Sequence, residues 1–256
     1  MNKIDNYNKD ERNMNATEQF SGEFDNYIDL TAEKQMAEAS KSLMTKVYGW
    51  MCGALGITAL TALFCAGSPW IMQIVFENPI VYWGTIILEF ALVVGVTAMI
   101  ERLSLRTATL LFVLYSIVNG ITMSIIFYLY SMATIATTFF VTAGMFGAMA
   151  VYGTVTKKDL SGWGTYLFMA LIGLILAGVV NYFVGNTVLD FIISVAGVVI
   201  FVGLTAFDAQ KIKRLLANAV EVNEGYQKVA LLGSLSLYLD FINMFLYLLR
   251  LFGRSK

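Results

Sequence analysis

Long runs of apolar residues dominate the chain from about residue 45 onward, and short polar segments separate them. Each run is about 20 residues long or slightly longer, which is the length that an α-helix needs to cross the hydrocarbon core of a bilayer. The pattern predicts an all-α integral membrane protein with seven transmembrane helices. These helices are predicted at residues 45–67, 80–100, 107–130, 135–156, 163–184, 188–209 and 229–250.

The chain before the first apolar run has a different character. Residues 1–40 are polar and rich in Asp and Glu, which is typical of a mobile tail. A helix over about residues 31–44 is predicted to lead into the first span. The domain organisation that follows is a polar, acidic, mobile tail at 1–40 and one transmembrane bundle at 41–256. The longest polar connection within the bundle is predicted at residues 210–228.

Lysine and arginine gather in alternate connections of the predicted bundle. The connections at 68–79, 131–134 and 185–187 contain neither residue, whereas the others do. By the positive-inside rule the basic connections are cytoplasmic, and so is the N-terminus. The expected location is the plasma membrane, which is the inner membrane if the cell is bacterial. The basic residues on the inner side are Lys41, Lys46, Arg102, Arg106, Lys157, Lys158, Lys211, Lys213, Arg214 and Lys228.

Two topologies remain open for the last span. Seven crossings place the basic tail Arg250, Arg254 and Lys256 outside, against the same rule. Either the span at 229–250 crosses fully, which its length favours, or it re-enters and returns the tail to the cytoplasm. Small residues are predicted to mediate contacts between the helices, because in lipid they let helix backbones approach closely. These residues are Gly49, Gly53, Gly56, Gly144 and Gly147.

Composition agrees with a membrane protein and excludes several functions. The chain is 58% hydrophobic and 14% charged, with a net charge of −1, which gives no support to a nucleic-acid partner. Cys52 and Cys65 both lie in the first span and are interpreted as small packing residues. Histidine is absent, so His-type metal sites and His-based catalytic triads are excluded. We expect no cofactor, and any pH sensing near neutrality must use carboxylates.

Carboxylates inside predicted spans are the most informative residues, since a central Asp costs about 2.5–3.5 kcal/mol in insertion scales. Glu89 and Asp240 lie well inside their spans, where the plain alternative is a protonated, hydrogen-bonded packing residue. Asp208 lies near the inner end of the sixth span and is equally compatible with an interfacial residue. Ordinary positions are assigned to Glu101 and Arg106, at a solvated helix end, and to Asp190, in a first helical turn where the helix dipole stabilises it.

Asp240 belongs to a polar face of the last span. Ser236 precedes it by four residues and Asn243 follows by three, so the three side chains share one side of the helix. Such a face is predicted to point into the bundle or into a wet cavity. If a second carboxylate lies in contact with Asp240, the two do not both ionise, and they titrate as a unit. This arrangement is a candidate pH switch without histidine.

Three stretches of the chain resemble the Bax inhibitor-1 family, also called the transmembrane Bax-inhibitor-motif or lifeguard family, and the bacterial members in particular. They are MTKVYGWMCGALGITALTA at 44–62, LTAFDAQKIK at 204–213 and SLYLDFINMFLYLLRLFG at 236–253. The resemblance extends from about residue 41 to the end. It implies a fold in which six helices surround a central seventh, and it implies a calcium leak that depends on pH.

The resemblance also assigns roles to particular residues. It implies that Asp208 and Asp240 form the pH sensor and bind Ca²⁺ transiently as it passes, so that Ca²⁺ is the permeant ion. It implies that Glu89 lines the ion path, which the polar face of Ser236, Asp240 and Asn243 continues. Arg102 matches an arginine that latches the aspartate pair.

The predicted span limits place Asp208 and Asp240 at different depths in the membrane, which disagrees with their pairing. Asp208 lies near the inner boundary, whereas Asp240 is about twelve residues, or roughly 18 Å, into its predicted helix. Contact therefore requires the last span to begin near Gly233 or the sixth helix to continue past Gln210.

A passive cation leak, with the lipid bilayer and Ca²⁺ as partners, is the leading functional hypothesis. The alternative is a membrane regulator without transport activity, because the resemblance includes bacterial proteins that associate with a membrane-bound ATP-dependent protease. Another membrane protein could take that place.

We do not expect an enzyme. Intramembrane aspartyl proteases carry a Gly-x-Gly-Asp motif, whereas Asp208 follows Ala206-Phe207 and Asp240 follows Tyr238-Leu239.

Overall fold

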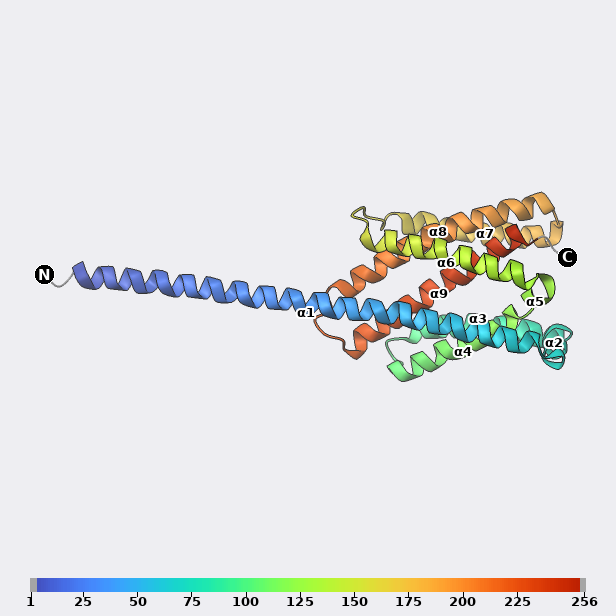
Figure 1. The fold of residues 1–256 in the computed structure, drawn as a ribbon, viewed down its shortest axis with the longest axis horizontal. Helices are drawn as coiled ribbons and strands as arrows, with labels where there is room; N and C mark the ends of the chain where they lie inside the picture. The colour runs from blue at the N-terminus through green and yellow to red at the C-terminus, as the bar shows by residue number, and fades with distance from the viewer. Residues whose placement is uncertain (1–3, 254–256) are drawn as a thin grey trace.

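The computed structural model describes residues 4–253, with side chains described from residue 30 onward. Within this part the regular elements are all helices, and seven stretches of helix are long and apolar enough to cross a membrane (Figure 1). The all-α prediction with seven spans is confirmed. The helices are α1 (Ile4–Ala66), α2 (Pro69–Phe76), α3 (Pro79–Met99), α4 (Leu105–Met123), α5 (Ile126–Leu129), α6 (Met132–Val155), α7 (Trp163–Val184), α8 (Thr187–Ala217) and α9 (Glu224–Phe252).

Local sequence explains where most of these helices begin. Asn78, Ser104, Ser131 and Asn223 each precede a helix, and their side-chain oxygens accept hydrogen bonds from backbone N–H groups of the first turn. Asn186 does the same for α8, where its side chain accepts from two backbone N–H groups. Polar capping residues at the ends of the short connections therefore set where the following helices begin.

Helix α1 continues from the polar N-terminal part into the first span without a break. Residues 31–44 are helical, as predicted, and the first part of α1 projects away from the bundle (Figure 1). The face that packs into the bundle carries Leu43, Val47 and Met51, which are buried. The mobility assigned to residues 1–40 stays a prediction.

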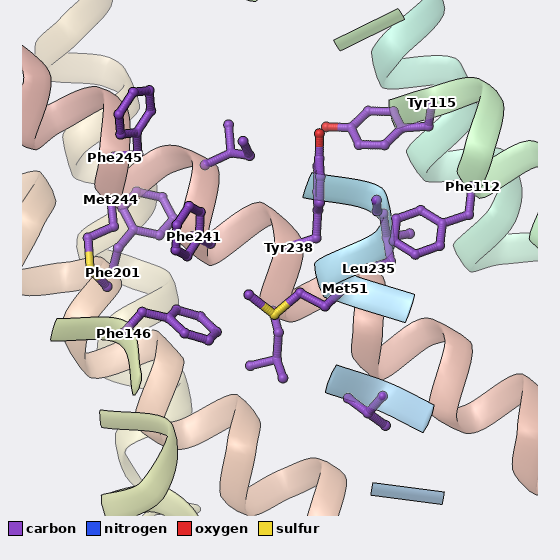
Figure 2. Close-up of a cluster of buried hydrophobic side chains, with 14 of the residues drawn as sticks. Met51, Phe112, Tyr115, Phe146, Phe201, Leu235, Tyr238, Phe241, Met244 and Phe245 are labelled. Carbon is purple, nitrogen blue, oxygen red and sulfur yellow. The ribbon is translucent and has the colours of Figure 1, made fainter. Parts of the chain in front are cut away.

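Helix α9 is the centre of the bundle, as the resemblance implied. In its most hydropathic stretch 67% of the residues are buried, against 11–44% in the other six spans. It packs against α1, α4, α6 and α8, while α3 packs on α4 and α7 packs on α8. Figure 2 shows the packing around Tyr238, whose ring lies 5.6 Å from that of Tyr115 and 5.9 Å from that of Phe112, centroid to centroid.

The full crossing of the last span is the topology that the structure has. Helix α9 is continuous over 29 residues, or about 43 Å, which exceeds the thickness of the hydrocarbon core. Its end lies beside the beginning of α8, where a guanidinium nitrogen of Arg250 is 3.8 Å from a carboxylate oxygen of Asp190. The end of α9 is therefore on the side of the bundle opposite the connection between α8 and α9.

Glycines do mediate close helix contacts in this chain, but the prediction is wrong for the glycines that it named. At each of the predicted contact glycines, an added Cβ would meet no neighbouring atom within 4 Å. Helices instead approach each other at Gly120, which faces the backbone of Thr58, and at Gly153, which faces the backbone of Ala206. Glycine spacing alone does not reveal which face of a helix turns inward. The predicted glycines, which face open space, are Gly49, Gly53, Gly56, Gly144 and Gly147.

Candidate functional site

One cavity of about 670 Å³ collects most of the predicted site residues. It lies among α3, α4, α7, α8 and α9, and its remaining lining is mainly apolar. Since the ionisable residues come from three different helices, only the packed bundle brings them to one space. The predicted residues that line it are Glu89, Asp208, Ser236, Asp240 and Asn243.

The depth disagreement between the two aspartates disappears because α8 is longer than the apolar run predicted. Helix α8 continues to Ala217, and α9 begins at Glu224, so most of the predicted polar connection at 210–228 is helical. Asp208 thus lies inside a helix rather than at its end. Of the two ways in which contact could arise, the structure has the continuation of the sixth span past Gln210.

A buried glutamine explains how α8 keeps these extra turns packed. The side chain of Gln210 is 6% exposed, accepts a hydrogen bond from Leu160 N at 2.8 Å and donates one to Lys158 O at 2.8 Å. One turn further on, Arg214 forms an ion pair with Asp159 at 2.7 Å. Both contacts attach α8 to the connection between α6 and α7. The buried Gln210 anchors these turns, whereas the solvent-exposed Arg214–Asp159 pair contributes little.

Asp208 and Asp240 meet through the polar face of α9. The hydroxyl of Ser236 donates a hydrogen bond to the Asp208 carboxylate, and Ser236 is one helical turn before Asp240. The two carboxylates line the same cavity, and the basic residue Lys211 follows Asp208 by three residues on α8. The side chain of Asn243 lines the same cavity, and its Nδ2 donates to Leu239 O at 2.8 Å.

Asp240 is the least satisfied polar residue of the cavity. It is 5% exposed, and among residues 30–253 its Oδ2 has no hydrogen-bond donor. A buried charge without a donor or a counter-ion is unfavourable, so this carboxyl group is suited to hold a proton or to meet a cation. In the described part of the chain no group of three or more acidic, Cys or His residues forms a metal cage.

Glu89 faces the same cavity from α3 and is held by residues of α4. Its carboxylate accepts hydrogen bonds from Thr122 Oγ1 at 2.6 Å and from Asn119 Nδ2 at 3.4 Å. Asn119 Oδ1 in turn accepts from the hydroxyl of Tyr238 at 3.0 Å, and that hydroxyl lies 2.7 Å from the hydroxyl of Thr58 on α1. A chain of hydrogen bonds therefore connects the cavity wall with α9 and α1.

Sequence reasoning did not identify Tyr238, Asn119 or Thr58 as parts of the site. Asn119 and Thr122 are polar residues in the middle of a predicted span, which is the signal that could have found them. Tyr238 offers no such signal, because tyrosine is common among apolar residues. Its partners become visible only when α1, α4 and α9 are packed together.

Arg102 does not line the cavity, and it is exposed in the turn that follows α3. It takes part in none of the ion pairs of residues 30–253, so the structure does not bring it into contact with the aspartate pair. Glu101 and Arg106 are exposed at the same end, as predicted for a solvated helix end. Asp190 is exposed in the first turn of α8, as predicted.

Comparison with known proteins identifies relatives over most of the chain. The family model described as inhibitor of apoptosis-promoting Bax1 matches residues 40–256. Inner membrane protein YbhL of Escherichia coli K12 is 47% identical over 218 residues, which cover 84% of this chain and 93% of the relative. An uncharacterised protein of Borreliella burgdorferi is 42% identical over 229 residues, which cover 90% of this chain and 99% of the relative.

Proposed function

Since the chain belongs to the Bax inhibitor-1 family, we propose that this integral membrane protein is a calcium leak channel that responds to pH. The observation that carries the proposal is the shared cavity, which Glu89 of α3, Asp208 of α8 and Asp240 of α9 all line. Carboxylate oxygens are the ligands that Ca²⁺ prefers. Acidic residues inside a membrane mark ion pathways, because they are too costly to keep without a role.

The proposed gate is the aspartate pair. At low pH Asp208 and Asp240 hold protons, and α9 keeps the path closed. As the pH rises the pair ionises, the two charges repel each other, and the freed oxygens can bind a divalent cation. Glu89 forms the next binding position, and Ser236 and Asn243 supply polar groups between them. Since the pair titrates as a unit, the pH response belongs to both residues together.

Arg102 enters this proposal as a latch for the closed state. Its exposed position beyond the end of α3 means that this role requires another arrangement of that helix end. By the positive-inside rule the connections that carry Lys and Arg are cytoplasmic, so the N-terminus and the gate are on the cytoplasmic side. The path is then gated from inside the cell.

The proposal is tested by calcium influx into liposomes that contain the purified protein, measured as a function of pH. Asp240→Asn and Asp208→Asn each remove one member of the pair, and we expect both variants to lose most of the pH response. Glu89→Asn is expected to reduce the flux but to keep its dependence on pH. If Asp240→Asn left both the flux and its pH response unchanged, the sensor assignment would be wrong.

Asp159→Asn is the matched control, since Asp159 is an exposed carboxylate outside the spans. The backbone N–H and the hydroxyl of Ser161, followed by Arg214, lower the pKa of Asp159 to about 2. Because this pKa is depressed, the contacts of the ionised group are lost only as pH falls toward about 2. Asp159 stays ionised across the neutral range, and its substitution is expected to leave the pH response unchanged.

A regulator without transport activity is the second candidate. The projecting first part of α1 is the observation in its favour, because it offers a partner a surface outside the bundle (Figure 1). The partner would be a membrane-bound ATP-dependent protease or another membrane protein. Deletion of residues 1–35 separates the two functions. Loss of partner pull-down with unchanged calcium flux would assign partner binding to α1, and unchanged pull-down would remove this candidate.

A further inference from the structure

A second large cavity lies away from the proposed ion path, in a groove between α1 and α6. Both helices pack on α8 and α9, and the groove between them has a volume of about 890 Å³. None of its lining residues lines the cavity that contains Asp240. What this groove binds is therefore a separate question from the calcium proposal.

The groove is polar at one end and apolar along the rest of its length. Lys41 of α1 and Lys213 of α8 line the end on the side of the basic connections. Met44 of α1, with Phe146 and Val151 of α6, lines the deeper part. From Thr154 back to Phe146 is eight residues, or about 12 Å along the helix, which is close to the roughly 15 Å of one leaflet's hydrocarbon layer. These dimensions suit an amphiphile that enters from one leaflet.

The two lysines are available to an anion. Lys213 Nζ donates a hydrogen bond to Thr154 O at 2.7 Å, which places the ammonium group at the rim of the groove and leaves two of its hydrogens for other acceptors. Lys41 forms no ion pair within residues 30–253. Glu33 is the one acidic residue in the lining, and it lies eight residues, or about 12 Å, from Lys41 along α1. The rim is therefore basic.

We propose that the groove binds an anionic phospholipid from the leaflet on the basic side of the bundle. The phosphate group lies between Lys41 and Lys213, and an acyl chain extends along α6 toward Phe146. Basic pockets between transmembrane helices on the cytoplasmic side are typical sites for anionic headgroups. A transmembrane helix of a partner fits less well, since it would cross both leaflets, whereas the groove lining on α6 extends only from Val155 back to Phe146, about the middle of that helix.

A larger side chain at Gly147 would fill the space proposed for the acyl chain. Gly147 lines the groove, and an added Cβ at this position meets no atom within 4 Å, so a larger side chain fits without displacing its neighbours. Gly147→Leu is therefore expected to fold normally and to occupy the space of the acyl chain. Gly173→Leu is the matched control, because Gly173 is exposed on α7, is equally open and lies outside the groove.

The test is native mass spectrometry of the full chain in detergent, titrated with phosphatidylglycerol or with phosphatidylcholine of the same acyl chains. We expect wild type to retain phosphatidylglycerol in preference. The double variant K41Q/K213Q should weaken this binding about fivefold for each lysine, or about 25-fold in total. Gly147→Leu should abolish it. Lys211→Gln, on the same helix but outside the groove, and Gly173→Leu should bind as wild type.

Several results would overturn the proposal. Equal retention of the two lipids would show that the headgroup charge is not recognised, and unchanged binding by Gly147→Leu would show that the groove is not the site. A co-purified protein that is lost in Gly147→Leu, with no lipid lost, would mean that a partner helix occupies the groove. A melting temperature measured for each variant confirms that binding is compared between folded proteins.

Discussion

Tyr238 and Asp240 lie two residues apart on α9 and have opposite surroundings. The hydroxyl of Tyr238 contacts both Thr58 and Asn119, whereas Asp240 Oδ2 has no donor among residues 30–253. Residues two apart on a helix point in nearly opposite directions, so one side chain faces α1 and α4 while the other faces the cavity. The first residue is hydrogen-bonded within the bundle, whereas the second leaves a buried carboxyl oxygen without a donor, which is unfavourable for stability.

The first prediction concerns the hydroxyl of Tyr238. Tyr238→Phe keeps the ring but leaves Asn119 and Thr58 without this partner in a buried region, which should lower the free energy of unfolding by about 1–3 kcal/mol. Chemical denaturation in detergent measures this change. Tyr247→Phe is the control, because the Tyr247 ring stacks on Phe201 and lines the cavity, and it is not part of the Tyr238–Asn119–Thr58 network. Equal effects of the two substitutions would contradict the assigned network.

The second prediction compares two buried polar side chains. Asp240→Leu should raise the free energy of unfolding by about 1–2 kcal/mol, since it removes a buried carboxyl oxygen that has no donor and leaves an apolar group in its place. Gln210→Leu should lower it by about 1–3 kcal/mol, because Leu160 N and Lys158 O would lose their partner. If Asp240→Leu destabilised the protein as much as Gln210→Leu, Asp240 would be a structural residue and not a functional one.

At the scale of the elements, close helix contacts depend on glycines that no spacing rule identified. Gly153 of α6 lies directly against the backbone of Ala206 on α8, and Gly120 of α4 lies against Thr58 on α1. The glycines of the first span and those at 144 and 147 leave open space beside the bundle. The inward face of α1 is set by its larger residues, such as Leu43 and Val47, because burial of apolar surface against α9 decides its orientation.

The third prediction tests this distinction with two substitutions in one helix. Gly153→Ala introduces a methyl group into the contact with the Ala206 backbone and should lower the free energy of unfolding by about 1–3 kcal/mol. Gly147→Ala meets open space and should raise it by up to about 1 kcal/mol through helix propensity. The two variants are compared by denaturation under identical conditions, and a destabilised Gly147→Ala would show that this face is packed.

For the whole molecule, the central position of α9 governs both topology and site. The helix crosses the bundle once, contacts four other spans, and carries the polar face that meets α8. Its first turn is also linked to the start of α4, where Leu105 N donates to a carboxylate oxygen of Glu224 at 3.0 Å. A change in the position of α9 would therefore act on the cavity and on several other helices together.

The fourth prediction concerns the sidedness of the two ends of α9. Phe252→Cys should react with a membrane-impermeant thiol reagent from one side of oriented vesicles, and Asp159→Cys should react from the other side. Both substituted positions are exposed. The native Cys52 and Cys65 lie within the first span, and the unsubstituted chain is the control for their reaction with the reagent. Reaction of both variants from the same side would contradict a full crossing.

The sequence by itself determined the membrane class, the seven spans and the presence of two carboxylates, Glu89 and Asp240, well inside those spans. Apolar length and the cost of a charge in lipid are properties of the chain that can be read without coordinates. The resemblance supplied Asp208 as the partner of Asp240, and both residues line the same cavity. The limits of the helices do not follow from hydropathy in the same way, because a helix can become polar without ending, as α8 does at residues 210–217.

Only the tertiary structure decided how these residues meet. The continuation of α8 brought Asp208 to the height of Ser236, and the packing of α1, α4 and α9 joined Tyr238 to Asn119 and Thr58. It also left Arg102 exposed and opened a groove beside Gly147. These outcomes depend on the rotation and depth of each helix against its neighbours. Such relations arise from contacts between segments far apart in the chain, which hydropathy and spacing within one segment do not encode.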